Sequence, residues 1–155
     1  MNSAIFFQSE TYPVSGPQLM GRNAAGASFI RGFLEYSRCN QFYIQVPDAE
    51  QAQTFLQLKN QYGRAEPVKA FLAQVNEPLI EAGNLYFPGP NIRELAIRRS
   101  FWGDHRWSLT GITHTTSSAL AMDAITELLT GPVQPHGSCL VDCPELIQVV
   151  VASLL

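Results

Sequence analysis

Short apolar runs alternate with longer amphipathic segments along this chain. Runs rich in β-branched and aromatic residues predict strands at residues 4–7, 42–46, 68–75, 85–87, 107–113, 139–141 and, less regularly, 149–151. Apolar positions that recur every three or four residues predict helices at about 23–37, 48–62, 78–82, 91–102 and 118–129. Strands that alternate with helices indicate an α/β fold, Rossmann-like, with a mostly parallel sheet and helices on both faces.

Polar and small residues set the expected helix boundaries. Asn23 and Asp48 precede helical segments and are good N-caps, and Ser117 or Ser118 is placed to cap the last one. Gly83 and Gly131 follow helical segments and are expected to end them. The apolar face expected for the last of these helices consists of Leu120, Ala124, Ile125, Leu128 and Leu129.

The composition suits a single globular domain spanning residues 1–155. Hydrophobic residues make up 46% of the chain and charged residues 15%, which is enough apolar material for a substantial core. The formal net charge of −3 argues against non-specific nucleic-acid binding, which needs a basic face. The N-terminus has no basic segment and does not resemble a signal peptide. The three cysteines do not form a disulfide framework, so reduced thiols and a cytoplasmic location are expected.

The first candidate site is the glycine-rich segment 16–26, which follows the first strand. Ligands of doubly wound sheets bind beyond the carboxyl ends of the strands, and a helix N-terminus favours anions. The spacing of Gly16, Gly21 and Gly26 matches neither a dinucleotide fingerprint nor a phosphate-binding loop with Gly-Lys-Ser/Thr. The alternative interpretation is a tight turn in which Gly26 serves helix packing.

The second candidate is the segment 111–118, in which His114 follows a strand and hydroxyl residues open a helix. A histidine at such a position can bind a sugar hydroxyl, act as a base or contact a phosphate. The alternative is that residues 115–118 only cap the helix while His114 bonds a nearby backbone group.

The third candidate is the segment 98–107, which contains three arginines, one histidine and two tryptophans. Aromatic rings beside cations can stack on a sugar or hold a phosphate. The alternative is a helix C-terminus where cations complement the dipole and tryptophans cover the core.

Two other kinds of chemistry are not indicated. Cys139, Cys143 and His136 lie close in sequence, but no second ligand pair has zinc spacing, so no metal site is expected. The chain also lacks the Gly-x-Ser-x-Gly elbow of serine hydrolases.

Four segments resemble, in the same order, the N-terminal half of a bacterial family of retaining GT-B glycosyltransferases. They are residues 19–26 (Leu-Met-Gly-Arg-Asn-Ala-Ala-Gly), 85–90 (Leu-Tyr-Phe-Pro-Gly-Pro), 111–115 (Gly-Ile-Thr-His-Thr) and 129–135 (Leu-Thr-Gly-Pro-Val-Gln-Pro). The resemblance implies an acceptor-side Rossmann-like domain, with transfer in a cleft shared with a second, donor-binding domain.

The resemblance also implies roles for particular residues. His114 would contact the transferred sugar and is the catalytic candidate. The glycine-rich loop around Gly21 would approach the donor phosphates or sugar. Substrate-binding roles fall on these residues: Gly21, Arg22, Asn23, Gly26 and Thr115. The chain itself needs no cofactor, whereas the full-length enzyme would use a nucleotide-sugar donor, whose sugar and acceptor the sequence leaves open.

The chain departs from the family pattern near its end. Residues 136–143 lack the expected aromatic-Asp pair, and the paired glutamates that grip the nucleotide sugar are absent. The apolar end at residues 151–155 suggests truncation, or a homo-oligomer formed through the C-terminus. The chain alone is therefore expected to be inactive, because catalysis needs donor and acceptor together. A non-catalytic domain that binds a glycan or a protein is the alternative, and a dinucleotide oxidoreductase is disfavoured because its fingerprint is missing.

Overall fold

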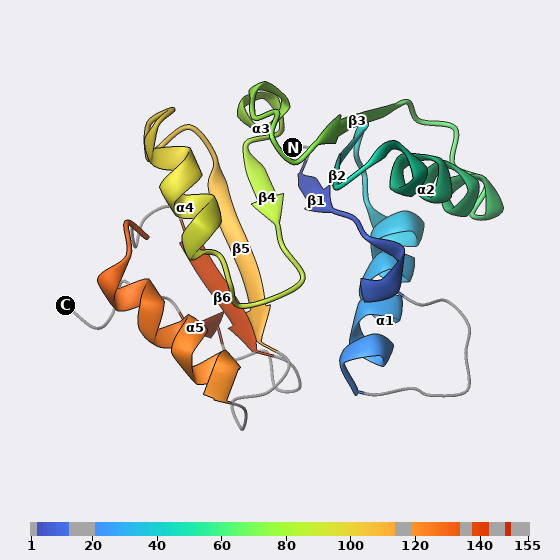
Figure 1. The fold of residues 1–155 in the computed structure, drawn as a ribbon. Helices are drawn as coiled ribbons and strands as arrows, with labels where there is room; N and C mark the ends of the chain where they lie inside the picture. The colour runs from blue at the N-terminus through green and yellow to red at the C-terminus, as the bar shows by residue number, and fades with distance from the viewer. Residues whose placement is uncertain (1–2, 13–20, 114–118, 134–137, 143–147, 150–155) are drawn as a thin grey trace. The chain divides into compact units, whose positions relative to one another are not determined.

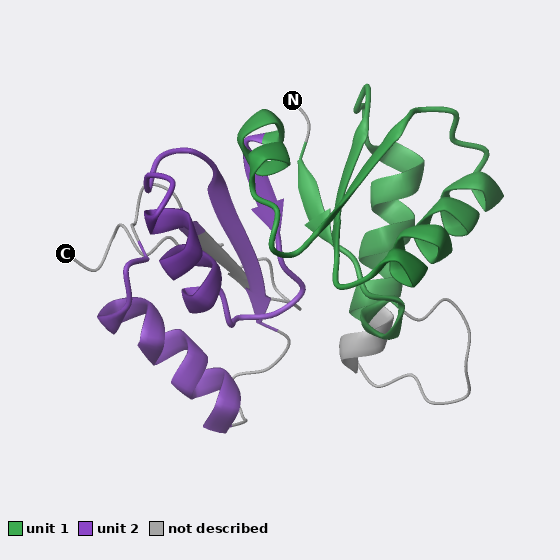
Figure 2. Ribbon diagram, turned by 45° about the horizontal axis from the view of Figure 1, so that its top comes forward, with its two compact units in different colours: residues 1–82 green, residues 83–155 purple. Residues whose placement is uncertain are grey.

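The computed structural model describes residues 3–12, 21–113, 119–133, 138–142 and 148–149. The chain divides into two compact units, unit 1 over Met1–Ala82 and unit 2 over Gly83–Leu155 (Figure 2). Strands and helices alternate within each unit (Figure 1).

Unit 1 contains three parallel strands in the order β3-β2-β1. The strands are β1 (Ala4–Phe6), β2 (Phe42–Val46) and β3 (Val68–Leu72). The helices are α1 (Gly21–Tyr36), α2 (Ala49–Gln61) and α3 (Glu77–Ala82), with a 3-10 turn, η1 (Ser9–Thr11).

Helices lie on both faces of the strands in unit 1, as alternate residues of β2 show. The Phe42 ring contacts Phe33 of α1 and Phe55 of α2, with ring centroids 5.6 Å and 6.0 Å away. The next residue, Tyr43, points to the opposite face and donates its hydroxyl proton to Glu81 of α3 at 3.2 Å. Because side chains alternate along a strand, α1 and α2 cover one face and α3 contacts the other.

Unit 2 contains the parallel strands β4, β5 and β6, followed by β7, which pairs antiparallel with β6. The strands are β4 (Asn84–Tyr86), β5 (Ser108–Thr113), β6 (Ser138–Asp142) and β7 (Gln148–Val149). The helices are α4 (Arg93–Ser100) and α5 (Ala119–Thr130). The core of this unit is mostly aliphatic, and its buried residues include Leu85, Ile92, Ala96, Leu109, Ala124 and Leu128.

The α/β, Rossmann-like class predicted from the sequence is confirmed by these parallel strands and their helices. The prediction for β2 coincides with the structure residue for residue. Asp48 caps α2 as predicted, because its side chain accepts a hydrogen bond from the Gln51 amide at 3.0 Å. Gly83 ends α3 with a φ of 77°, a left-handed conformation that glycine adopts at little cost. The prediction of one domain over residues 1–155 stays a prediction.

Two details of the helix predictions are wrong. Asn23 is not an N-cap, since α1 begins at Gly21 and already includes it. Leu120 and Leu129 do not belong to the buried face of α5, because both are exposed. The buried residues of α5 are Ala121, Ala124 and Leu128, so a small residue at 121 lies inward where a larger one at 120 was expected. Ser117 and Ser118 lie outside the described residues.

Candidate functional site

The carboxyl ends of β4 and β5 form one edge of unit 2, and two of the segments singled out in the sequence meet there. The Phe87 amide donates to the Thr110 carbonyl at 2.8 Å, and the Ile112 amide donates to the Gly89 carbonyl at 3.1 Å. The segment 87–90 therefore continues beside the last residues of β5 after β4 has ended. Residues 85–90 and 111–113, separated in sequence by about two dozen positions, lie side by side.

This edge is well anchored on its sheet side. Thr113, the last residue of β5, is buried. Further from this edge, the Thr110 hydroxyl donates to Oδ1 of Asn84, the first residue of β4, at 3.1 Å and so connects the two strands. The Gly89 amide donates to the Phe87 carbonyl at 2.9 Å, which turns the chain directly after the strand. His114 directly follows Thr113, the last residue of β5, in the chain. His114 and Thr115 lie outside the described residues, so their predicted role and the nearness of His114 to the glycine-rich loop stay predictions.

In unit 1 the corresponding edge follows β1. The Tyr12 hydroxyl donates to the Phe6 carbonyl at 2.9 Å, so the tyrosine folds back over the end of the strand. Its ring stacks between Phe7 and Phe29, with centroid distances of 5.6 Å and 6.1 Å. Nothing in the sequence singles out Tyr12, because only the tertiary fold brings Phe29 of α1 and the end of β1 to the same ring.

The predicted binding residues of unit 1 lie on α1. Gly21, Arg22 and Asn23 form its first turn, where backbone N–H groups without helical partners favour an anion. Gly26 is buried, and a Cβ there would overlap the backbone carbonyl of Thr11 in η1. Close packing of α1 against η1 accounts for a glycine at position 26 without a ligand, which is the alternative that the sequence left open.

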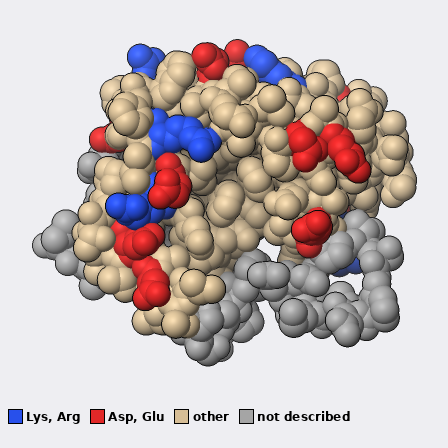
Figure 3. Space-filling model, in the orientation of Figure 1, with Lys and Arg blue, Asp and Glu red and all other residues tan. Residues whose placement is uncertain are grey.

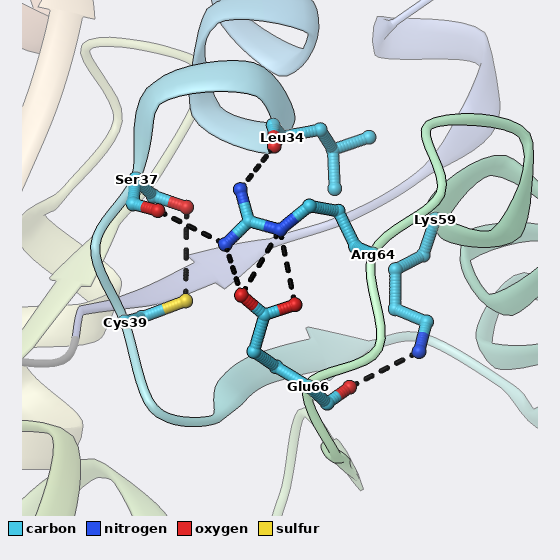
Figure 4. Close-up of polar contacts among 6 residues, drawn as sticks. All are labelled: Leu34, Ser37, Cys39, Lys59, Arg64 and Glu66. Atoms are coloured by element: carbon cyan, nitrogen blue, oxygen red, sulfur yellow. Dashed lines mark hydrogen bonds and ion pairs between the residues drawn. The ribbon is translucent and has the colours of Figure 1, made fainter.

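A charged cluster centred on Arg64 lies at the end of α1 (Figure 4). The Arg64 guanidinium donates to the carbonyls of Leu34 and Ser37 and forms an ion pair with Glu66 at 2.6 Å. The hydrogen bonds from Arg64 lower the pKa of Glu66 to about 2, and those to Glu66 raise the pKa of Arg64. Arg64 thus binds one carbonyl in the last turn of α1 and one directly after the helix, where carbonyls have no partner within the helix, so the cluster has a structural role.

A second group, formed by Tyr43, Lys69 and Glu81, connects α3 to the sheet. Lys69 Nζ lies 2.7 Å from Glu81 Oε2 and 5.8 Å from the centroid of the Tyr43 ring. The hydrogen bond from Lys69 lowers the pKa of Glu81. Both strand residues are near the amino ends of β2 and β3, the edge opposite to the one where ligands of parallel sheets bind.

The third segment from the sequence, residues 98–107, covers the end of α4 and the loop before β5. Arg99 is fully buried and donates to the Trp107 carbonyl at 2.9 Å and to the Ser138 hydroxyl at 3.3 Å. Burial lowers the pKa of Arg99, and the Asp104 carboxylate opposes part of that shift. Trp107 is also buried, whereas Phe101 and Trp102 are exposed. The segment therefore contains two buried residues with a structural role, Arg99 and Trp107, and two exposed aromatic residues, Phe101 and Trp102.

The described part of the chain contains neither a candidate metal cluster nor a candidate membrane-spanning helix. No group of three or more histidine, cysteine, aspartate or glutamate side chains is arranged there to hold a metal ion. None of the described helices combines the length and apolar character that a membrane span requires.

Comparisons with known proteins add no family to this picture. The chain matches no protein-family model, no curated protein and no solved structure.

Proposed function

We propose that this chain is the acceptor-side domain of a retaining, GT-B-type glycosyltransferase that uses a nucleotide sugar. One observation carries the proposal: residues 85–90 and 111–113, from two of the segments that resemble the family, adjoin at the carboxyl edge of unit 2. This is the edge where parallel sheets bind their ligands, and the catalytic candidate His114 follows directly.

The proposed chemistry assigns different tasks to the two units. His114, with Thr115, contacts the sugar during transfer, as a hydrogen-bond partner or a base. The first turn of α1, with Gly21, Arg22 and Asn23, approaches the donor phosphates through its N–H groups. Gly26 contributes indirectly by allowing α1 to pack on η1. A second, donor-binding domain supplies the grip on the nucleotide, and we place the reaction in the cytoplasm.

The proposal is tested by NMR titration of this chain with a panel of saccharides and, separately, with nucleotide sugars. Saccharides that serve as acceptors are expected to shift the amide signals of Gly89, Gly111 and Thr113. Nucleotide sugars are expected to bind weakly, because the proposed donor-binding residues are in the second domain. Tight nucleotide-sugar binding by this chain, or saccharide shifts confined to other regions, would contradict the assignment.

The role of His114 is tested in a protein that carries both domains. His114→Ala should lower kcat by more than it weakens nucleotide binding, since the proposed contact is with the reacting sugar. His105→Ala is the matched control, because His105 is exposed on the loop at the amino end of β5 and should leave kcat unchanged. Saccharide binding without any transfer by the unaltered two-domain protein would instead favour a non-catalytic glycan-binding domain.

A further inference from the structure

The loop between α4 and β5, residues 101–107, presents two neighbouring aromatic side chains to solvent. Phe101 is 85% exposed and Trp102 is 39% exposed, whereas Trp107 at the end of the same loop is buried. A single exposed apolar side chain is ordinary on a protein surface, but adjacent exposed phenylalanine and tryptophan are typical of an interaction site. We call residues 101–107 the Phe101 loop.

The Phe101 loop has a defined conformation. The Trp102 amide donates to the Arg99 carbonyl at 2.8 Å, and the Arg106 amide donates to the Gly103 carbonyl at 3.1 Å. Gly103 has a φ of 105°, which strongly favours glycine at this position in the turn. The fully buried Arg99 ties the base of the loop to the Trp107 carbonyl. Phe101 is thus held outward on a preorganised loop, which lowers the entropic cost of binding.

One positive charge lies next to Trp102. Arg106 is exposed, its Nε donates to the Trp102 carbonyl at 3.3 Å, and it forms no ion pair with any residue that the structure describes. The loop's one acidic residue, Asp104, is only half-exposed and acts electrostatically on the buried Arg99. The outer side of the loop therefore offers two aromatic rings together with one cation.

The charge distribution excludes two kinds of partner. Residues 83–155 contain six acidic and four basic side chains, and one of the basic residues, Arg99, is buried. Acidic and basic side chains are interspersed over the face of the described chain that Figure 3 shows. Membranes and nucleic acids bind extended basic clusters, and three exposed or partly exposed arginines among the described residues of this unit do not form one of that size. Protein interfaces, in contrast, favour aromatic residues and arginine at their centres.

We infer that the Phe101 loop docks an acidic protein segment that carries aromatic or aliphatic side chains. Apolar side chains of the partner pack on Phe101 and Trp102, and a carboxylate of the partner pairs with Arg106. The loop leads into the amino end of β5, while His114 follows the carboxyl end of this six-residue strand. The two ends of such a strand are roughly 17 Å apart, so docking at the loop leaves the proposed catalytic edge accessible.

The inference is tested with a defined probe, a random copolymer of glutamate and tyrosine, titrated into the 155-residue chain. Intrinsic tryptophan fluorescence reports binding, because Trp102 is partly exposed while Trp107, the only other tryptophan, is buried. The copolymer is expected to bind more tightly than polyglutamate, and a lysine-tyrosine copolymer is expected not to bind. Raising the salt concentration should weaken the interaction, because its ionic part is exposed.

Phe101→Ala should weaken copolymer binding about tenfold or more, as expected for an aromatic anchor. Tyr36→Ala is the matched control, since Tyr36 is 78% exposed at the end of α1 and should change binding by less than about twofold. Arg106→Gln should weaken binding and flatten its salt dependence, and circular dichroism should show all three variants folded. Equal binding by the Phe101 and Tyr36 variants would overturn the inference, as would binding to phosphatidylserine vesicles without binding to the copolymer.

Discussion

The two units differ in what the described polar side chains near their helix ends do. In unit 1, side chains near the surface bind backbone groups at helix ends: Asp48 caps the start of α2, and Arg64 binds carbonyls at the end of α1. In unit 2, α4 begins after the buried Ile92 without a side-chain cap among the described residues, and its last turn contains the fully buried Arg99.

The contrast between Arg64 and Arg99 shows what environment does to the same side chain. Arg64 faces a carboxylate and retains some contact with water, and its hydrogen bonds to Glu66 raise its pKa. Arg99 donates to neutral oxygens in the core, and burial lowers its pKa. When the donor of a hydrogen bond near the surface is removed, water can take its place. When a buried donor is removed, its acceptor is left without a hydrogen-bond partner. Unit 2 should therefore depend more strongly on its arginine than unit 1 does.

The largest effect is expected for Arg99→Ala. The substitution leaves a cavity and removes the donors to the Trp107 carbonyl and the Ser138 hydroxyl, so the free energy of unfolding should fall by about 3–5 kcal/mol. Urea denaturation measures this change. Arg64→Ala should cost clearly less, because water can reach the groups that Arg64 leaves behind, and equal losses for the two variants would remove the contrast between the units.

The next largest loss of stability is expected for Gly26→Ala in unit 1, where α1 packs closely on η1. In Gly26→Ala the added Cβ would overlap the Thr11 carbonyl, and the shift of α1 or η1 should cost about 1–3 kcal/mol. Gly32→Ala on the same helix is the matched control, because nothing lies within 4 Å of the added Cβ. That variant should be stabilised by about 0.5–1 kcal/mol, since alanine is the better helix former. Thermal unfolding measures the stability of both variants. A Gly26→Ala variant more stable than the original protein would show that η1 does not pack tightly on α1.

Removing the polar cap of α2 should have a smaller effect. Asp48→Ala leaves the Gln51 amide without its acceptor and should lower the free energy of unfolding by about 1 kcal/mol. Asp48→Asn keeps an acceptor oxygen and should stay close to the original protein. If the asparagine variant lost as much as the alanine variant, the negative charge at the helix N-terminus would matter more than the hydrogen bond.

Local signals in the sequence were sufficient for much of the fold. The strand at 42–46, the cap at Asp48 and the stop at Gly83 each depend on residues within a few positions, and all three are confirmed. The inward face of α5 was predicted wrongly, because leucines occur on several sides of that helix and periodicity alone does not select among them. Tertiary packing makes that choice, and it favours the small Ala121.

The candidate site can be predicted from the sequence only in part, because local segments are visible in the sequence and their contacts in the fold are not. The sequence singled out residues 85–90 and 111–115 separately, and the parallel pairing of β4 and β5 brings their described parts together. The sequence gives no signal for the structural role of Arg64, because its partners Leu34 and Ser37 are 30 and 27 residues away in sequence. Similarly, nothing in the spacing of residues 98–107 distinguishes the buried Arg99 from the exposed Arg106, since the fold alone decides which cation is covered.

The smallest effect at neutral pH is expected for the ion pair of Arg64 and Glu66, but its dependence on pH is distinctive. Arg64 holds the pKa of Glu66 at about 2 in the folded chain, below the ordinary value of 4.5. A depressed pKa stabilises the fold above pH 4.5, and this contribution is lost as the pH falls toward about 2, where the carboxylate takes up a proton. Glu66→Gln has no charge to lose, so its urea midpoint should fall less steeply than that of the original protein over this range. Glu81→Gln is the comparison variant, because Lys69 lowers the pKa of Glu81 as well and some of the slope belongs to that pair. Curves that remain parallel for Glu66→Gln and the original protein would show that the surface tie of unit 1 stabilises the fold through the hydrogen bonds of Arg64 to Leu34 and Ser37 and not through the charge of Glu66.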